Sequence, residues 1–172
     1  MTAAEIAPAS APRRLVRARV GGPGWDFNAA HTGLHNGVFE PLHGHTYQVT
    51  LTTWGEPDDA GMVADFAVLK KALRAALAPL KRRTLLATRA EGVLVIEDDE
   101  LVHVTGGGAF FTLPRRWVTL LPIASTSTEA LASHVAQCLA QSVAASCPGV
   151  ERLEVTVTES SECAATAEAI LR

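Results

Sequence analysis

Residues 43–54 of the chain read HGHTYQVTLTTW, a stretch that joins a pair of histidines to a strand pattern. Aromatic, aliphatic and β-branched residues occupy alternate positions within it: Tyr47, Val49, Leu51 and Thr53. This alternation is typical of a half-buried β-strand, which we predict over residues 45–54. Side chains at i and i+2 of extended backbone project to the same face, so His43 and His45 can both reach one point.

The same kinds of periodicity divide the rest of the chain. Apolar residues at helical spacing predict one helix from about residue 66 to 78, with Asp65 as its N-cap, and a second from about residue 127 to 145. Strands or extended segments are predicted at residues 15–20, 25–30, 93–96, 101–105, 110–113, 117–121, 153–158 and 164–171. Turns or loops are predicted at residues 21–24, 31–42 and 55–61. This order favours an α+β fold, in which an antiparallel sheet carries both helices on one face and a β-rich insertion separates them.

Composition and charge narrow the class of protein. The 172 residues suit one domain, predicted over residues 13–172, behind an Ala-, Pro- and Ser-rich flexible tail at residues 1–12. A net charge of -3 argues against a nucleic-acid partner, which would need clustered Lys and Arg. No apolar run approaches the roughly 20 residues that span a membrane. Three cysteines without CxxC spacing, and no signal-peptide pattern, predict a cytoplasmic protein with free thiols.

A third histidine can join the HGH pair. His31 ends the extended segment that precedes the predicted loop, and it can complete a three-histidine set with His43 and His45. Zinc held by three histidines keeps a fourth position open for water or substrate, so this set predicts a catalytic Zn2+ site. The alternative is that HGH is a solvated loop without a metal. The other histidines are predicted to be loop, surface or packing residues: His35, near the mouth of the site, His103 and His134.

Five motifs follow one another along the chain: FNAAH at residues 27–31, LHGHTY at 42–47, GMVADF at 61–66 with Leu69-Lys70 after it, STEALA at 127–132 and VTES at 157–160. Together they resemble the 6-pyruvoyltetrahydropterin synthase and 6-carboxytetrahydropterin synthase family. The resemblance extends from about residue 14 to the C-terminus. Because several motifs occur in the same order, it is specific.

This resemblance implies a tunnelling fold, in which a four-stranded antiparallel sheet and two helices per subunit assemble into a homotrimer or homohexamer with active sites between subunits. It also implies zinc on His31, His43 and His45, and a pterin-like substrate held by Glu159. A carboxylate can accept two parallel hydrogen bonds from the ring N–H and the amino group of a pterin. The alternative for Glu159 is a solvated acid at the end of a strand.

The chain departs from the family at the position of its catalytic cysteine, four residues before HGH, where Phe39 stands. The next residue, Glu40, resembles a variant branch in which glutamate replaces the cysteine. In that branch the side chain of dihydroneopterin triphosphate is cleaved between carbons. A carboxylate next to zinc can take a hydroxyl proton, so Glu40 is the predicted catalytic base. The alternative is a loop acid without a role.

A second departure lies just after the first predicted helix. The family's Asp-His pair is expected there, and this chain has Lys81 and Arg82 instead. Arginine stays protonated and cannot act as a general base. The two cations could hold a phosphate or carboxylate of the substrate, which makes Arg82 a predicted substrate-binding residue. They could equally be surface charges.

Taken together, the residues and the resemblance predict a zinc-dependent lyase that acts on the side chain of a dihydroneopterin-type pterin, by carbon–carbon cleavage or elimination. Two alternatives stay open. The same fold and zinc site could serve another substrate in a specialised biosynthetic pathway, or the protein could be a non-catalytic pterin-binding homologue. Retention of all three histidines favours catalysis, because a binding module needs no open metal position.

Overall fold

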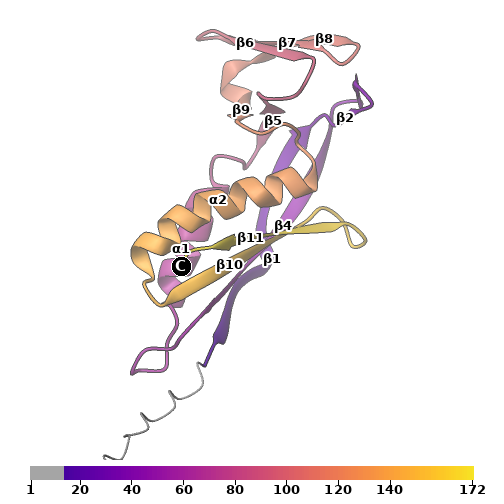
Figure 1. The fold of residues 1–172 in the computed structure, drawn as a ribbon. Helices are drawn as coiled ribbons and strands as arrows, with labels where there is room; N and C mark the ends of the chain where they lie inside the picture. The colour runs from indigo at the N-terminus through magenta and orange to yellow at the C-terminus, as the bar shows by residue number, and fades with distance from the viewer. Residues whose placement is uncertain (1–13) are drawn as a thin grey trace, which may run out of the picture.

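A six-stranded sheet forms the centre of the computed structural model, which describes residues 14–172 (Figure 1). Its strands lie in the order β11-β10-β4-β1-β5-β9. Their bounds are β1 Val16–His31, β4 His43–Gly55, β5 Arg83–Ala87, β9 Val118–Leu121, β10 Val150–Thr158 and β11 Ala164–Ile170. The tail predicted at residues 1–12 lies outside the described residues.

The predicted fold class is confirmed, although the sheet is larger than expected. β11, β10, β4 and β1 pair antiparallel, and β5 and β9 extend this four-stranded unit by pairing in parallel. The sequence did not predict β5. Its three central residues, Thr84, Leu85 and Leu86, are all buried. Since successive residues of a strand face opposite sides, β5 is covered on both faces and lacks the alternation that identifies a half-buried strand.

Both helices cover the same face of the sheet and begin where the sequence predicts (Figure 1). Asp65 caps α1 (Phe66–Leu77) by accepting a 2.7 Å hydrogen bond from the Ala67 amide. Ser127 caps α2 (Thr128–Ser146) in the same way, by accepting from the Ala130 amide. Within the described residues, neither helix combines the length and the apolar run needed to cross a bilayer. Side chains with no exposed surface fill the space between helices and sheet, among them Phe27, Tyr47, Leu51, Leu69, Leu73, Leu131 and Leu153.

The turn predicted at residues 21–24 is wrong, because β1 passes through this segment as one strand with a β-bulge. Its pairing with β4 shifts register between Gly21 and Asp26. Gly21 has a φ of 103°, and a Cβ at this position would meet the carbonyl oxygen of Val49 on β4. Turns and β-bulges both use glycine because it adopts a positive φ without strain. The sequence alone therefore does not distinguish a turn from a bulge here.

We expect Gly21→Ala to lower the free energy of unfolding by more than about 1 kcal/mol, because both the positive φ and the close carbonyl oxygen oppose a side chain. Urea unfolding of the two proteins measures the difference. Gly24→Ala is the matched control: Gly24 has a φ of 82°, but nothing lies within 4 Å of an added Cβ. An equal loss of stability in both variants would contradict a role for the Val49 contact.

The predicted β-rich insertion forms a separate antiparallel sheet at one end of the molecule (Figure 1). Its strands are β6 Val93–Glu97, β7 Leu101–Gly106 and β8 Ala109–Pro114, followed by a short 3-10 helix at Arg115–Trp117. A second core lies under this sheet, formed by Leu86, Val102, Val104 and Val118.

The loop predicted over residues 31–42 contains a small hairpin made of β2 (Leu34–His35) and β3 (Val38–Phe39). Phe39, which stands where the family has its cysteine, packs against the second core, with its ring 5.9 Å from that of Phe111. The insertion therefore supports the segment that leads into His43.

Candidate active site

The ends of β1 and β4 bring three imidazole rings together. His31 is the last residue of β1, and it pairs with His43, the first residue of β4. The ring centroids are 4.5 Å apart for His31 and His43, 4.9 Å for His43 and His45, and 5.2 Å for His31 and His45. One nitrogen of each ring lies within 4.8 Å of the others. The predicted three-histidine cluster therefore forms, and its nitrogens are close enough to share one metal ion.

Hydrogen bonds from the Nδ1 atoms orient two of the rings. His31 Nδ1 lies 3.2 Å from Thr126 Oγ1, and this hydroxyl donates to the Thr32 carbonyl, so the imidazole N–H donates to Thr126. His43 Nδ1 donates to the Pro41 carbonyl at 2.8 Å. In both rings Nε2 keeps its lone pair, and a second hydrogen bond of this kind is typical of metal-binding histidines.

The third ring contributes a buried nitrogen. His45 Nε2 has no hydrogen-bond partner among the described residues, although Glu159 Oε1 lies 3.2 Å away. Burial, together with the neighbouring His43 and His45, lowers the pKa of His31 and so favours its neutral form, the form that binds a metal. A buried nitrogen without a hydrogen-bond partner, beside two oriented imidazoles, fits a divalent ion such as zinc.

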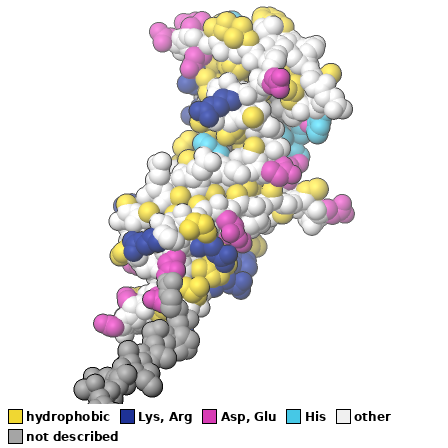
Figure 2. Space-filling view, in the orientation of Figure 1, with side chains coloured by type: hydrophobic (Ala, Val, Ile, Leu, Met, Phe, Trp, Pro, Cys, Tyr) yellow, Lys and Arg dark blue, Asp and Glu magenta, His cyan; other side chains and the backbone are white. Residues whose placement is uncertain are grey.

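A cavity of about 530 Å³ opens over the three rings. Four carboxylates from different segments line it: Glu40, Glu129, Glu159 and Glu162. Among the described residues, no Lys or Arg lines this cavity. Figure 2 shows histidine side chains at the junction between the insertion and the main sheet, with an acidic side chain beside them. This chain therefore offers nitrogen ligands and proton acceptors in this cavity.

Glu159 follows β10 and reaches the cavity beside His45. Thr128, in the first turn of α2, donates a short hydrogen bond to Glu159 Oε2, and Oε1 faces His45. The Glu159 amide donates to the Cys163 carbonyl at 2.9 Å, which closes the turn between β10 and β11. The carboxylate of the predicted ring anchor is thus oriented by groups on separate elements.

Glu40 lies on the segment between β3 and β4. Its backbone is held at both ends, because Thr32 Oγ1 donates to the Glu40 carbonyl at 2.7 Å and the Glu40 amide donates to the Gly33 carbonyl at 2.9 Å. The side chain is 40% exposed and lines the same cavity as the histidines. The predicted base and the predicted ligands therefore share one cavity.

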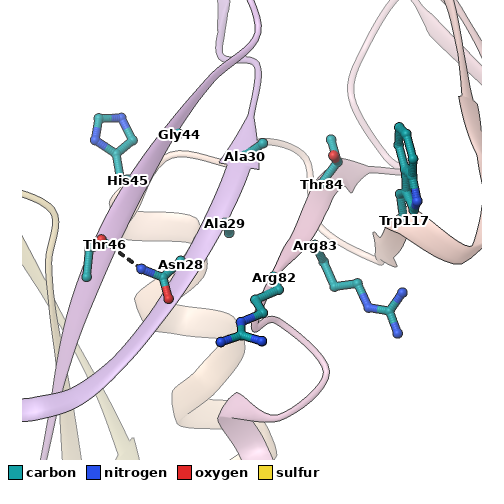
Figure 3. A pocket seen from close by; sticks show the side chains of 10 residues that line it. All are labelled: Asn28, Ala29, Ala30, Gly44, His45, Thr46, Arg82, Arg83, Thr84 and Trp117. Atoms are coloured by element: carbon teal, nitrogen blue, oxygen red, sulfur yellow. Dashed lines mark hydrogen bonds between the residues drawn. The ribbon is translucent and has the colours of Figure 1, made fainter.

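Arg82 does not line the 530 Å³ cavity, although one predicted ligand, His45, lines both that cavity and the cavity of Arg82. Arg82 lines a second cavity of about 610 Å³, together with Asn28, Thr46 and Trp117 (Figure 3). Arg82 and Arg83 extend in opposite directions from the start of β5 (Figure 3). Lys81 forms an ion pair with Asp26 instead, with its Nζ 3.5 Å from the carboxylate. Of the three histidines, only His45 therefore shares a cavity with Arg82 in this chain.

The structure adds residues to the site that the sequence did not assign to it. The Tyr47 hydroxyl lies 3.2 Å from His31 Nε2, and burial and the Glu159 carboxylate raise its pKa. Its position two residues after His45, on the same strand face, is a signal that could have identified it. Thr126 and Cys163 are distant in sequence from the histidines, so no local pattern indicates them. All three cysteines are free, as predicted.

The fold and the site together define an α+β protein with a three-histidine cluster at the end of its main sheet. Comparison with known proteins identifies the family: the model of the 6-pyruvoyl tetrahydropterin synthase family matches residues 25–169, and the chain belongs to this family. Family membership supports an enzyme of the pterin-processing lyase type.

Three relatives illustrate the similarity. A candidate 6-carboxy-5,6,7,8-tetrahydropterin synthase of Methanocaldococcus jannaschii is 30% identical over 66% of this chain and 70% of its own length. The crystal structure of Plasmodium vivax 6-pyruvoyl tetrahydropterin synthase is 27% identical, with a TM-score of 0.85 over 91% of this chain and 99% of that chain. A variant of the Plasmodium vivax enzyme, with a glutamate described as a catalytic residue replaced by alanine, is 27% identical, with a TM-score of 0.83 over the same shares of both chains.

Proposed function

We propose that this protein is a zinc-dependent lyase that acts on the side chain of a dihydroneopterin-type pterin, by carbon–carbon cleavage or elimination. The observation that carries the proposal is that one cavity holds the imidazoles of His31, His43 and His45 together with the carboxylates of Glu40 and Glu159. This combination supplies a metal site, a proton acceptor and a ring anchor in one place.

His31, His43 and His45 would hold the zinc ion, which when bound supplies Lewis-acid stabilisation of negative charge on a substrate oxygen. The hydrogen bonds of His31 to Thr126 and of His43 to Pro41 support this assignment, because they hold the rings in the ligand tautomer before any ion binds. Three protein ligands leave a further position for the substrate, as catalytic zinc sites do.

Glu159 would orient the substrate by its pterin ring. A carboxylate can accept two parallel, charge-assisted hydrogen bonds from the ring N–H and the amino group. The hydrogen bond from Thr128 supports this role, since it limits rotation of the carboxylate before the ring arrives. The short distance from Glu159 to His45 would bring the ring side chain close to the metal site.

Glu40 would be the general base that takes the proton of a side-chain hydroxyl. Its place in the same cavity as the histidines supports this role. A glutamate described as a catalytic residue in the similar Plasmodium vivax enzyme gives further support. Phe39, at the position of the family's cysteine, packs into the second core and is a hydrocarbon, so it has no proton to exchange.

Arg82 would act on the cavity of another subunit. One subunit alone lines this cavity with four carboxylates, so a phosphate-bearing substrate would need cations from outside it. A homotrimer or homohexamer with active sites between subunits, as the family resemblance implies, would bring Arg82 of one subunit to the cavity of the next. A guanidinium group there would bind a substrate phosphate or carboxylate.

The proposal is tested by measuring bound zinc in protein prepared without chelators, and by incubating this protein with 7,8-dihydroneopterin triphosphate and with its dephosphorylated form. Mass spectrometry follows the products. We expect about one zinc ion per chain and a pterin with a shortened side chain, because the cavity combines one metal site with one base.

The other outcomes separate the alternatives. Zinc without turnover of either pterin would contradict the lyase and favour a redirected substrate or a non-catalytic pterin-binding protein. Absence of zinc would contradict the metal site itself. A preference for the dephosphorylated pterin would contradict the role of Arg82 as a phosphate contact and leave the lyase standing.

A further inference from the structure

His35 and Glu40 lie side by side at the mouth of the histidine cavity. His35 Nε2 lies 3.2 Å from Glu40 Oε1, and both side chains line this cavity. The other carboxylate oxygen, Oε2, lies against Gly33, where an added Cβ would be 2.5 Å from it. One oxygen of the Glu40 carboxylate therefore lies against the Gly33 backbone and the other against the His35 imidazole.

The hairpin that carries His35 is built to hold this geometry. His35 pairs with Val38 across the Asn36-Gly37 turn, in which both central residues have positive φ, 50° and 76°. Asn-Gly in this conformation is the favoured two-residue connection of a tight hairpin. His35 is thus presented from a short, well-defined turn and not from an open loop.

The far end of the hairpin is tied to the insertion. The Phe39 amide donates to the Gly107 carbonyl at 2.8 Å, and a Cβ at Gly107 would be 2.6 Å from the Phe39 ring. Gly107 has a φ of 58°, a conformation that suits glycine. These contacts hold the backbone immediately before Glu40, so the insertion and the hairpin together set the position of the His35–Glu40 pair.

The exposure of the two side chains indicates what the pair does. The His35 side chain is 77% exposed and that of Glu40 is 40% exposed. A contact between side chains at such exposure contributes little to stability. Both side chains reach bulk water, and the more exposed of the two is an imidazole, the side chain best suited to exchange protons near neutral pH.

We propose that His35 is the positioning residue of Glu40 and the group through which Glu40 exchanges its proton with solvent. The inference rests on the proposed function. Glu40 takes the hydroxyl proton as the oxygen–carbon double bond forms and the neighbouring carbon–carbon bond breaks. The electron pair of the broken bond goes to the pterin-side carbon, which takes a proton from solvent. Glu40 then passes its proton to His35 Nε2, and His35 releases a proton to water, which restores both groups and balances the charge.

The test uses His35→Gln in the full-length, zinc-loaded protein. Glutamine can donate a hydrogen bond to Glu40, but its amide cannot take up and release a proton near neutral pH. We expect kcat to fall by about 10-fold or more, within the range that positioned proton transfer contributes, while KM and zinc content stay unchanged. Added imidazole should restore part of the lost kcat, because it can take over the proton transfer at an exposed position.

His103→Gln is the matched control. His103 is also a partly exposed histidine near a carboxylate, 4.0 Å from Asp98, but it lies on β7 outside the cavity. This variant should keep the kcat of the unaltered protein, and it also measures any inhibition by imidazole itself. An unchanged kcat in His35→Gln, or a loss that imidazole does not restore, would overturn the inference.

The closing comparison separates this inference from the proposed function. If Glu40→Gln is inactive while His35→Gln is fully active, only the role of His35 fails. If the unaltered zinc-loaded protein turns over no pterin, the proposed function fails and the inference fails with it.

Discussion

Replacing His43 by alanine is expected to remove zinc from the protein, and pterin turnover with it, while the fold persists. His43 is exposed, so the loss of its side chain leaves no buried hole. Loss of a hydrogen-bond partner behind a metal ligand weakens metal binding by about 10- to 100-fold, so loss of a ligand should weaken it by more than about 100-fold. Metal analysis and competition with a chelator measure the change.

His103→Ala serves as the control for this prediction, because it removes a histidine from the insertion and leaves the three-histidine cluster intact. It should bind zinc as the unaltered protein does. Removal of zinc by a chelator and its restoration should switch turnover off and on in both the control and the unaltered protein. If His43→Ala keeps zinc with unchanged affinity, the cluster is not the metal site.

Replacing Glu40 by glutamine is expected to lower kcat by about 100- to 10,000-fold, the usual contribution of a positioned general base. Glutamine has nearly the same shape, and the backbone contacts of Glu40 to Thr32 and Gly33 do not involve the side chain. The fold and the zinc content should therefore stay unchanged. Turnover of the pterin, followed by mass spectrometry, measures the effect.

Glu91→Gln is the corresponding control, since Glu91 is an exposed glutamate in the turn before β6 and lies outside the cavity. Its kcat should equal that of the unaltered protein. Unchanged turnover in Glu40→Gln would assign proton removal to another cavity group. Loss of zinc in that variant would mean that Glu40 acts as a ligand and not as the base.

The two predictions define different parts of the chemistry. If His43→Ala abolishes turnover but Glu40→Gln does not, the reaction needs the metal and does not need Glu40 as its base. The reverse result would point to acid–base chemistry that does not depend on the histidine cluster. Only the loss of turnover in both variants, with zinc retained in Glu40→Gln alone, agrees with the proposed lyase.

Local patterns in the sequence predicted the main elements and the three-histidine cluster. The alternation after His45 identified β4, the N-cap residue Asp65 marked the start of α1, and apolar spacing placed the start of α2 near residue 127. These features depend on neighbours within a few positions, so periodicity and capping chemistry suffice to predict them. The close approach of His43 and His45 follows from strand geometry in the same way.

The tertiary structure decided what depends on contacts between distant segments. The parallel pairing of β5, the support of Phe39 by the insertion, and the location of Arg82 in a second cavity have no local signal. The contact of His35 with Glu40 depends on the Asn36-Gly37 turn and on how the surrounding chain places it. Periodicity reports which face of an element is buried. It does not report which other element covers that face, and the chemistry of this site depends on that choice.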